Sequence, residues 1–318
     1  MSRDSPDRQA LASRREYDRR MNRLLDHIDR HLDTPMELAV LAEVAHFSPF
    51  HFHRLFVAWM GETLGDYQRR RRLDAGALML VHRGGMSVFE VALAVGFGSG
   101  EAFARAFKRQ FGVTPGTWRR EAPVRWTERL AAMRVDWQVR NPDQGEKRWD
   151  GHTGGSPTKE PEMKIEIATL PAVRVAYMRH IGPYGPGIER FWAETFLPWR
   201  AAQGLDGAPC YGIGHDDPFV TPAGKCRYDA CVEVPDGFQA TGPVGIATLP
   251  GGRYAVAAFE GTGADLGLAW NELLRAWLPA SGMHPDGRPL FEHYAGDAAK
   301  DPDTGRFRCG LCIPVRPL

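Results

Sequence analysis

Apolar residues recur at helical spacing between residues 86 and 120, where they predict two short helices joined by a tight turn. The inward stripe of the first helix consists of Val88, Val91, Ala92 and Val95. Spacings of three, four and seven residues place these side chains on one helix face. Ser87 and Glu90 have the spacing of a capping box at the start of this helix. Gly96 favours the turn, because glycine adopts positive φ without strain, and Ser99 then caps the second helix.

The second of these helices separates an apolar face from a small and basic one. Its inward stripe is formed by Phe103, Ala106 and Phe107, and its outer face by Gly100, Glu101, Ala104, Arg105 and Lys108. Small residues in the first turn let a helix approach base edges, and an arginine one turn later suits a major groove. The pattern therefore predicts a helix-turn-helix element that contacts DNA.

Residues 34–59 carry the same arrangement. Thr34 and Glu37 form a second capping-box pattern, with Pro35 at the first helical position, where its missing N–H is not needed. The inward stripe of this first helix is Leu38, Leu41, Ala42 and Ala45. A turn at His46-Phe47 follows. We therefore expect a second helix-turn-helix element here.

The second helix of this earlier element begins at Ser48-Pro49. Its inward stripe is Phe52, Leu55, Phe56 and Trp59, and its outer face carries Phe50, His51, His53 and Arg54. Arg54 and Phe56 match Arg105 and Phe107 at a constant offset of 51. The repetition indicates two reading helices of the same design.

The segments around these elements are predicted to support them. Residues 65–81 have the composition of one helix, with Arg69–Arg72 at its centre. A helix of about 15 residues spans roughly 22 Å, enough to hold two reading helices apart on one face of a duplex. Residues 22–32 predict a scaffold helix. Residues 1–20 are charged and aperiodic and predict a mobile arm, which either touches DNA phosphates or is simply solvated.

The segment from Met21 to Arg120 resembles the AraC-type DNA-binding domain, with Gly96-Phe97 and the run from Phe107 to Pro115 as its signature. The resemblance implies an all-α fold of seven helices with two helix-turn-helix units, for which we set bounds of 21–122. It also implies a transcription regulator that binds double-stranded DNA, with RNA polymerase as a further candidate partner. By resemblance the base-contacting positions are Phe50, His53 and Arg54 in the first unit and Gly100, Glu101, Ala104 and Arg105 in the second, with Lys108 beside them.

From about Asn141 to Glu162 the sequence loses periodicity and concentrates Gly, Pro, Ser and charge, and we set the bounds of the linker at 123–162. Such a composition predicts an exposed linker. Residues 124–139 fit either a trailing helix or the start of that linker. After Met163 the pattern changes to short β-branched runs separated by turns, with two longer helices, so a second domain is expected at 163–318.

This second domain is internally repeated. Residues 167–174 (IATLPAVR) recur at 246–253 (IATLPGGR) with an offset of 79 and six of eight residues identical, and residues 228–235 align with 307–314 at the same offset. The repeat predicts two half-domains of one fold. The expected elements are strands at 163–169, 174–181, 210–216 and 227–234 with a helix at 188–203, then strands at 245–249, 254–260, 290–295 and 307–315 with a helix at 266–278.

This half resembles the GyrI-like effector-binding domain, a tandem βαββ duplication of α+β class that binds small molecules in transcription regulators. The motifs are residues 180–184 (HIGPY), the Trp-bearing helices and residues 291–294 (FEHY). In the family an acidic residue at the last motif faces the ligand cavity, which places Glu292 there. In the repeat Glu292 corresponds to Gly212, so the two halves differ at the position where we expect them to meet.

A carboxylate among aromatic rings suits a cationic or amphipathic aromatic effector, because charge pairing adds to cation–π attraction. The candidate effector-binding residues are Glu292, Tyr294, Tyr184, Trp192 and Trp270. The alternative is that Glu292 is exposed or pairs with Arg288 or Arg308. We expect Trp199 and Trp277 to be core residues, and Glu260 is a second candidate carboxylate or a surface residue at a strand end.

Composition and charge further limit the number of domains, the localisation and the kind of partner. The chain has 318 residues, 43% hydrophobic and 25% charged, which suits two globular domains. A charged N-terminus and the lack of an 18-residue apolar run predict a cytoplasmic, nucleoid-associated protein without a membrane partner. Residues 1–129 carry a net charge of +5 and residues 130–318 one of −4, so the positive half is the one expected to meet phosphates.

The five cysteines are expected to be reduced thiols. Cys309 and Cys312 form a C-x-x-C pair in a predicted strand, where positions three apart point to opposite faces, so a structural role is favoured over a metal or redox site. His51 and His53 are two apart, which is not a same-face spacing on a helix. We therefore expect neither a metal nor a cofactor.

Three functions fit the second domain. The leading one is effector sensing by a regulator. A GyrI-like hydrolase would use Glu292 with Tyr294 or Tyr184 for acid–base chemistry, but a Ser-His-Asp arrangement and a phosphate loop are not visible, so we expect no enzyme and no catalytic residues. The third is a domain that binds a protein partner. The chain is expected to be a monomer or a homodimer.

Overall fold

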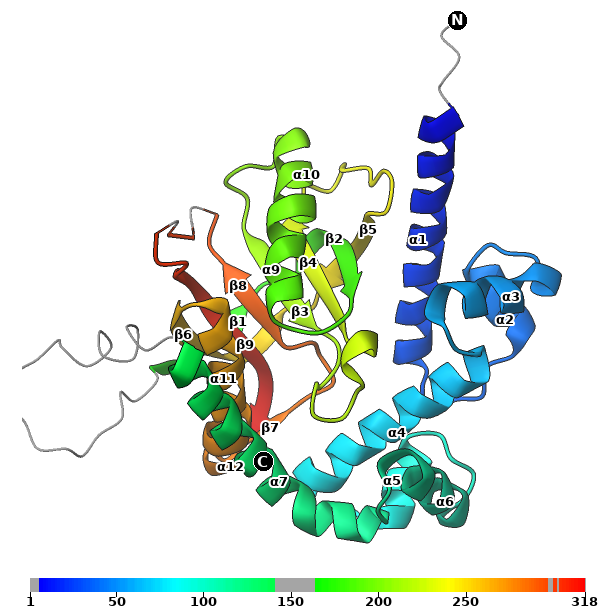
Figure 1. Ribbon diagram of the computed structural model, residues 1–318, viewed down its shortest axis with the longest axis vertical. Helices are drawn as coiled ribbons and strands as arrows, with labels where there is room; N and C mark the ends of the chain where they lie inside the picture. The colour runs from blue at the N-terminus through cyan, green and yellow to red at the C-terminus, as the bar shows by residue number, and fades with distance from the viewer. Residues whose placement is uncertain (1–5, 141–163, 297–299, 302, 318) are drawn as a thin grey trace, which may run out of the picture. The chain divides into compact units, whose positions relative to one another are not determined.

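The computed structural model describes residues 6–140, 164–296, 300–301 and 303–317. It divides into two compact units (Figure 1): a helical unit, Met1–Trp126 with Ala240–Gly245, and a sheet unit, Thr127–Gln239 with Ile246–Leu318. The predicted linker at 141–162 lies outside the described residues. Among the helices that are described, none has the length and apolar character needed to cross a membrane.

The helical unit contains two helix-turn-helix elements, as predicted. Its helices are α1 (Pro6–Arg30), α2 (Leu38–Val44), α3 (Pro49–Met60), α4 (Leu64–His82), α5 (Val88–Ala94) and α6 (Gly100–Phe111), followed by α7 (Pro115–Arg140), of which the part up to Trp126 belongs to this unit. Phe52 and Phe56 of α3 are fully buried, and so are Phe103 and Phe107 of α6. These two pairs are related by the offset of 51 and fill the same place in each element.

The caps of the second element form as the sequence predicts. The Glu90 amide donates to the Ser87 hydroxyl over 3.1 Å, and the Ser87 amide donates to the Glu90 carboxylate over 2.7 Å. The Ser99 hydroxyl accepts from the Ala102 amide at the start of α6. Gly96 has φ of 80° in the turn, and a Cβ there would meet the Leu32 carbonyl oxygen at 2.7 Å, so glycine is required on both counts.

Four sequence predictions about this unit are corrected or decided. Residues 6–20, expected as an arm, belong to α1. The capping box at Thr34 is wrong: α2 begins only at Leu38, because the Thr34 hydroxyl donates to the His31 carbonyl and so completes the turn after α1. Leu38 is 43% exposed and does not belong to the inward stripe. The alternatives left open for residues 124–139 resolve to a helix, since α7 continues to Arg140.

The arginine run at the centre of α4 holds the helical unit together. Arg70 donates to Glu62 over 2.8 Å and lies 3.4 Å from the carboxylate of Asp74. Arg71 pairs with Asp29 of α1 over 3.1 Å. These arginines therefore connect α4 to its neighbours.

Arg72 connects the two elements directly. Its guanidinium donates to the carbonyl oxygens of Leu32, Thr34 and Gly96 over 2.7, 2.9 and 3.0 Å. Leu32 and Thr34 precede the first element, and Gly96 lies in the turn of the second. One side chain thus fixes both elements to the helix between them.

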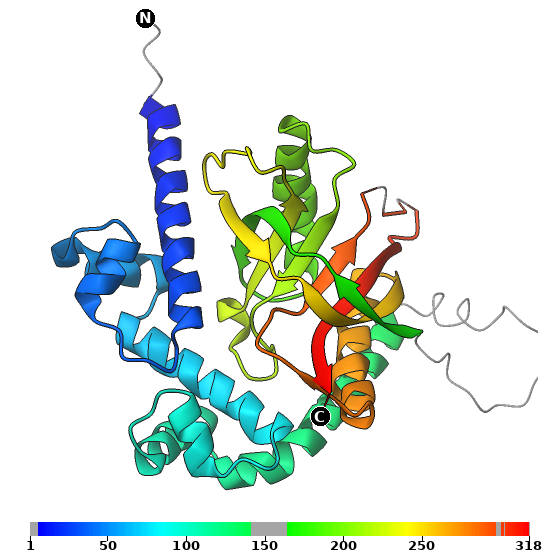
Figure 2. The same cartoon turned by 180° about the vertical axis from the view of Figure 1, so that it is seen from behind.

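The sheet unit is an antiparallel sheet whose order follows the internal repeat. Its strands are β1 (Ile165–Leu170), β2 (Val173–Ile181), β3 (Cys210–Gly214), β4 (Arg227–Glu233), β5 (Gly245–Leu249), β6 (Gly252–Gly261), β7 (Met283–Pro285), β8 (Phe291–Tyr294) and β9 (Phe307–Pro317). The order is β1-β6-β9-β8-β3-β4-β2-β5, with the short, unpredicted β7 beside β9. Equivalent strands lie symmetrically about the β3–β8 pair, and the outermost strands β1 and β5 each pair with the other half (Figure 2).

Each half carries one helix with a wide turn in its middle. The segments are α9 (Pro186–Phe191), η1 (Trp192–Phe196) and α10 (Leu197–Ala202) in the first half, and α11 (Gly263–Glu272), η3 (Leu273–Trp277) and α12 (Leu278–Ala280) in the second. Both η segments are π-helical and end just before a Leu-Pro pair, Leu197-Pro198 and Leu278-Pro279. Proline lacks an N–H and its ring crowds the carbonyl four residues earlier, so a wider turn relieves the clash.

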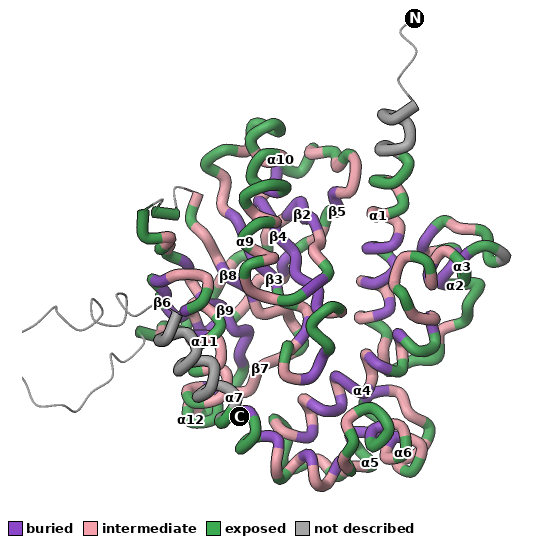
Figure 3. Tube along the Cα trace, viewed as in Figure 1, coloured by how far each residue is buried: buried purple, intermediate pink, exposed green. Residues whose placement is uncertain are grey.

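Two clusters of buried apolar residues pack against the sheet, one on each face. Figure 3 shows how far each residue along the chain is buried. Cys309 belongs to the cluster under α11 and Cys312 to the cluster on the other face, as the strand argument predicts. Burial raises the pKa of both thiols, so they are poor nucleophiles and metal ligands.

Candidate functional site

The outer faces of α3 and α6 are exposed, as a DNA-reading role requires. His51, His53 and Arg54 of α3 are exposed, and so are Glu101, Arg105 and Lys108 of α6. Gly100 and Ala104 are partly covered, and a Cβ at Gly100 would contact the Phe89 ring at 3.5 Å. Phe50 belongs to α3, but its side chain lies outside what the structure describes.

In the sheet unit the centre of the candidate site is Glu292 in β8. Its side chain is 6% exposed. Its Oε2 accepts from the Tyr228 hydroxyl over 2.7 Å and from the Tyr294 hydroxyl over 3.0 Å, and its Oε1 accepts from the Trp270 indole N–H over 3.1 Å. Burial raises the pKa of Glu292, and these three hydrogen bonds offset part of that rise by stabilising the carboxylate.

The site lies where the two halves of the sheet meet. Gly212 of β3 is the direct cross-strand partner of Glu292, and the two are also equivalent in the repeat. A Cβ at Gly212 would overlap both the Tyr228 hydroxyl and the Glu292 carboxylate. The glycine of the first half therefore makes the room that the carboxylate of the second half occupies.

Aromatic side chains from both helices close over this carboxylate. The Trp192 indole N–H donates to the Tyr228 hydroxyl over 3.2 Å, and the Trp192 ring lies 5.4 Å from that of Tyr294. Because Trp192 and Trp270 reach the same pair of hydrogen-bonded groups, both helices cover the same face of the sheet. The π-helical turn starts at Trp192 itself.

Tyr184, the fifth predicted effector residue, makes different bonds. Its hydroxyl donates to the Arg227 carbonyl over 2.6 Å and accepts from the Asp216 amide over 3.2 Å. Its ring meets that of Tyr228 edge-on at 6.3 Å. The structure thus groups Glu292, Tyr294, Trp192 and Trp270, and leaves Tyr184 one ring farther away.

The two arginines considered as ion-pair partners of Glu292 pair with other carboxylates. Arg288 pairs with Asp286, and Arg308 with Glu260 over 2.8 Å. Glu260 is half exposed, and its pairing with Arg308 and Arg306 lowers its pKa, so it is a surface residue. Trp277 packs in the cluster under α11.

Tyr228 is the site residue that the sequence argument missed. It is 4% exposed, and burial followed by the charge of Glu292 raises its pKa well above the ordinary value, so it remains a donor. A signal was available: Tyr228 aligns with Phe307 in the repeat. The phenol oxygen is present in one copy and absent from the other.

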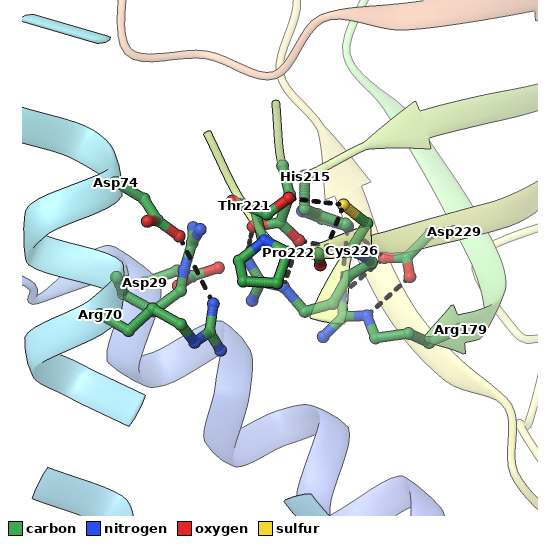
Figure 4. A network of polar contacts seen from close by, with 12 residues as sticks. Asp29, Arg70, Asp74, Arg179, His215, Thr221, Pro222, Cys226 and Asp229 are labelled. Carbon is green, nitrogen blue, oxygen red and sulfur yellow. Dashed lines mark hydrogen bonds and ion pairs between the residues drawn. The ribbon is translucent and has the colours of Figure 1, made fainter. Parts of the chain in front are cut away.

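A second polar group lies on the opposite face of the sheet. Arg179 of β2 donates twice to Asp229 of β4 over 2.7 Å, and His215 Nε2 lies 2.7 Å from the same carboxylate (Figure 4). Burial acts to raise the pKa of Asp229, but the contacts with Arg179 and His215 outweigh it and hold that pKa below its usual range. A cluster of three or more His, Cys, Asp or Glu side chains that could hold a metal ion does not occur within the described ranges.

Comparisons with known proteins match each unit separately and the chain as a whole. Residues 41–121 match a helix-turn-helix domain model, and residues 163–316 match the model of the GyrI-like small molecule binding domain. The SPbeta prophage protein YosT of Bacillus subtilis is 33% identical over 155 residues, 48% of this chain and 100% of its own length. The right origin-binding protein of Escherichia coli K12 is 27% identical over 315 residues, 92% of this chain and 96% of its own. The regulatory protein SoxS of Escherichia coli K12 is 36% identical over 96 residues, 30% of this chain and 89% of its own.

Proposed function

Because this chain belongs to the AraC-type DNA-binding transcription regulators and carries a GyrI-like small-molecule-binding domain, we propose that it is a one-component sensor. In this proposal the helical unit reads operator DNA, and the sheet unit binds an effector that changes this reading. An effector can do so only if its affinity differs between a state that binds the operator and one that does not. RNA polymerase would then be the downstream partner.

The repeated helix-turn-helix supports the DNA-reading part of the proposal. Two recognition helices held by one connecting helix suit two successive major-groove segments about 10 bp apart. The proposed base-contacting residues are Phe50, His53 and Arg54 of α3 and Gly100, Glu101, Ala104 and Arg105 of α6, with Lys108 beside them. Since Gly100 and Ala104 offer only van der Waals contact, α3 should carry more of the sequence information.

Replacing Arg54 by alanine should relax specificity at one base pair. An arginine that donates to a base edge contributes about 1 to 3 kcal/mol of discrimination, so Arg54→Ala should bind the operator less tightly and tolerate substitutions at that pair. Competition binding with every single-base variant of a selected duplex measures this effect. Arg125→Ala, an exposed arginine of α7, is the matched control. An equal loss on every sequence would show that Arg54 contacts only phosphate.

The buried carboxylate of Glu292 carries the effector-sensing part of the proposal. Its hydrogen bonds come from two phenols and an indole, which are neutral groups, so its charge lacks an ionic partner among the contacts described above. A flat or amphipathic cation that displaces one of these donors would gain a charge-assisted contact in a low-dielectric site and stack on the surrounding rings. We therefore propose an organic cation as the effector.

Glu292→Gln should weaken cationic ligands by about tenfold, because one charge-assisted hydrogen bond becomes a neutral one. A thermal-shift screen of cationic aromatic compounds and their neutral isosteres finds the ligands, and calorimetry measures them. In the unsubstituted protein, affinity for a cation should fall as pH falls through the raised pKa of Glu292, since the protonated carboxyl has no charge. Glu260→Gln, which removes a surface carboxylate, should keep both the affinity and its pH dependence.

Acid–base catalysis in the sheet unit is less well supported by the same contacts. Burial raises the pKa of Tyr294 well above its ordinary value, so its hydroxyl cannot serve as a base near neutral pH. The Tyr184 hydroxyl donates to a backbone carbonyl. Turnover of a ligand found in the screen would support the hydrolase alternative.

A further inference from the structure

Two hollows flank the recognition helices at equivalent positions. One, of about 380 Å³, is lined by Arg69, Phe97, Ala102, Arg105, Ala106 and Arg109. The other, of about 400 Å³, is lined by Tyr17, His46, Phe47, Ser48, His51, Arg54 and Leu55. Four pairs of lining residues are related by the offset of 51: His46 and Phe97, His51 and Ala102, Arg54 and Arg105, Leu55 and Ala106. The hollow is therefore a feature of the repeated element.

The two hollows differ in their chemistry. In the first element Tyr17 stacks on Phe47 with 5.2 Å between ring centres, so an aromatic pair forms part of the wall. In the second element the wall carries three guanidinium groups, Arg69 from α4 and Arg105 and Arg109 from α6. The hollow of the first element has one arginine, Arg54, so the hollow of the second element has the stronger cationic lining for an anion.

The three arginines remain available to a ligand. The Arg69 side chain is 48% exposed and lies 3.3 Å from Asp66, and that of Arg105 is 74% exposed and lies 3.7 Å from Glu101. Ion pairs as exposed as these are worth little and exchange readily with another anion. Arg69 also contrasts with Arg70, Arg71 and Arg72, whose contacts hold the fold.

The position of this hollow on α6 indicates that its ligand belongs to the DNA backbone. Ala102, Arg105 and Arg109 follow one another at three- and four-residue spacing along one side of the helix, with Arg105 at the edge of the outer face that also carries Gly100 and Ala104. A helix that lies in a major groove turns its outer face to the base edges and its flanks to the phosphates on either side. An anion in this hollow would thus be a phosphodiester.

We propose that Arg69, Arg105 and Arg109 bind one backbone phosphate of the operator, an inference that rests on the proposed DNA-reading function. The contact extends the interface from α6 to α4. For Arg105, this inference replaces the base contact given under the proposed function with a contact to the backbone, while the other proposed base-contacting residues keep their roles. A phosphate held by two helices would set the depth and register of α6 in the groove.

The test measures salt dependence with the full chain. Fluorescence anisotropy gives the affinity of the unsubstituted protein, Arg69→Ala and Arg109→Ala for two duplexes, one selected from a random library and one of scrambled sequence, between about 50 and 200 mM salt. Each lost phosphate contact should reduce the slope of log K against log salt by about 0.9. The drop in affinity between the lowest and the highest salt concentration should therefore be roughly 3.5-fold smaller for the variant than for the unsubstituted protein. Both duplexes should be weakened by the same factor.

Controls separate the remaining outcomes. Arg69→Lys, which keeps the charge, should recover most of the affinity, and Arg190→Ala, an exposed arginine of the sheet unit, should match the unsubstituted protein. Loss on the selected duplex alone would mean base contact and overturn the inference. Unchanged DNA binding together with reduced transcription by purified RNA polymerase would also overturn it, in favour of an acidic protein surface. If the unsubstituted protein bound neither duplex, the proposed function itself would fail.

Discussion

Arg72→Ala should lower the free energy of unfolding of the helical unit by about 3 to 4 kcal/mol, because three charge-assisted hydrogen bonds to backbone carbonyls are lost together. The carbonyls of Leu32, Thr34 and Gly96 would need water in place of the guanidinium. Since Leu32 and Thr34 lie just before the first helix-turn-helix element and Gly96 lies in the turn of the second, we also expect weaker DNA binding through a less defined spacing of α3 and α6.

Urea unfolding followed by circular dichroism at the helical signal measures the loss, with a separate transition expected for each unit. Arg69→Ala removes the same charge one turn earlier and should change stability by less than about 0.5 kcal/mol. Arg72→Lys should restore little, because an ammonium cannot reach three carbonyls in the geometry of a guanidinium. Equal stability of Arg72→Ala and Arg69→Ala would refute the role assigned to Arg72.

Gly212→Val should destabilise the sheet unit by about 3 kcal/mol, since overpacking a filled site forces neighbouring side chains from their rotamers. The side chain would occupy the place of the Tyr228 hydroxyl and the Glu292 carboxylate. Effector affinity should fall at the same time, because the carboxylate cannot keep its position between Tyr228 and Trp270.

The same urea unfolding experiment, read at the transition of the sheet unit, measures this loss. Gly267→Ala in α11, where a Cβ meets nothing within 4 Å, is the matched control and should be neutral or slightly stabilising. Tyr228→Phe removes one of the two clashing groups, so it should make Gly212→Ala less costly than it is alone. Additive effects of Gly212→Ala and Tyr228→Phe would argue against the proposed overlap.

The parts of the structure that the sequence predicts well are governed by local chemistry. Helical periodicity, the Ser87 and Ser99 caps and the glycine at position 96 act within one turn of chain, so they can be recognised without knowing the fold. The internal repeat extends this to long range, because a constant offset identifies equivalent positions. Gly212 and Glu292 are 80 residues apart, one more than the general offset of 79, and were matched before their cross-strand pairing was seen by aligning Pro209 with Pro289.

What the sequence does not predict depends on partners that are distant in the chain. In the run Arg69–Arg72 four identical residues have four different roles, decided by groups up to 42 residues away. The Thr34 prediction failed for a different, local reason, because the hydroxyl donates to the His31 carbonyl three residues earlier and does not cap the following helix. The π-helical turns before Pro198 and Pro279 were not predicted either, because they depend on packing against the sheet as well as on the local crowding by the proline ring.

The pairing of Gly212 with Glu292 limits how such a domain can arise and how many ligands it can hold. The two positions are equivalent and lie opposite each other, so a homodimer of a single half would place either two carboxylates or two glycines there. Two acids would repel one another at this distance, and two glycines would supply no anion. An unequal pair requires copies that are covalently joined and free to diverge, and it leaves one carboxylate at this pair of positions in each chain. Titration with a cation should therefore follow a single-site isotherm.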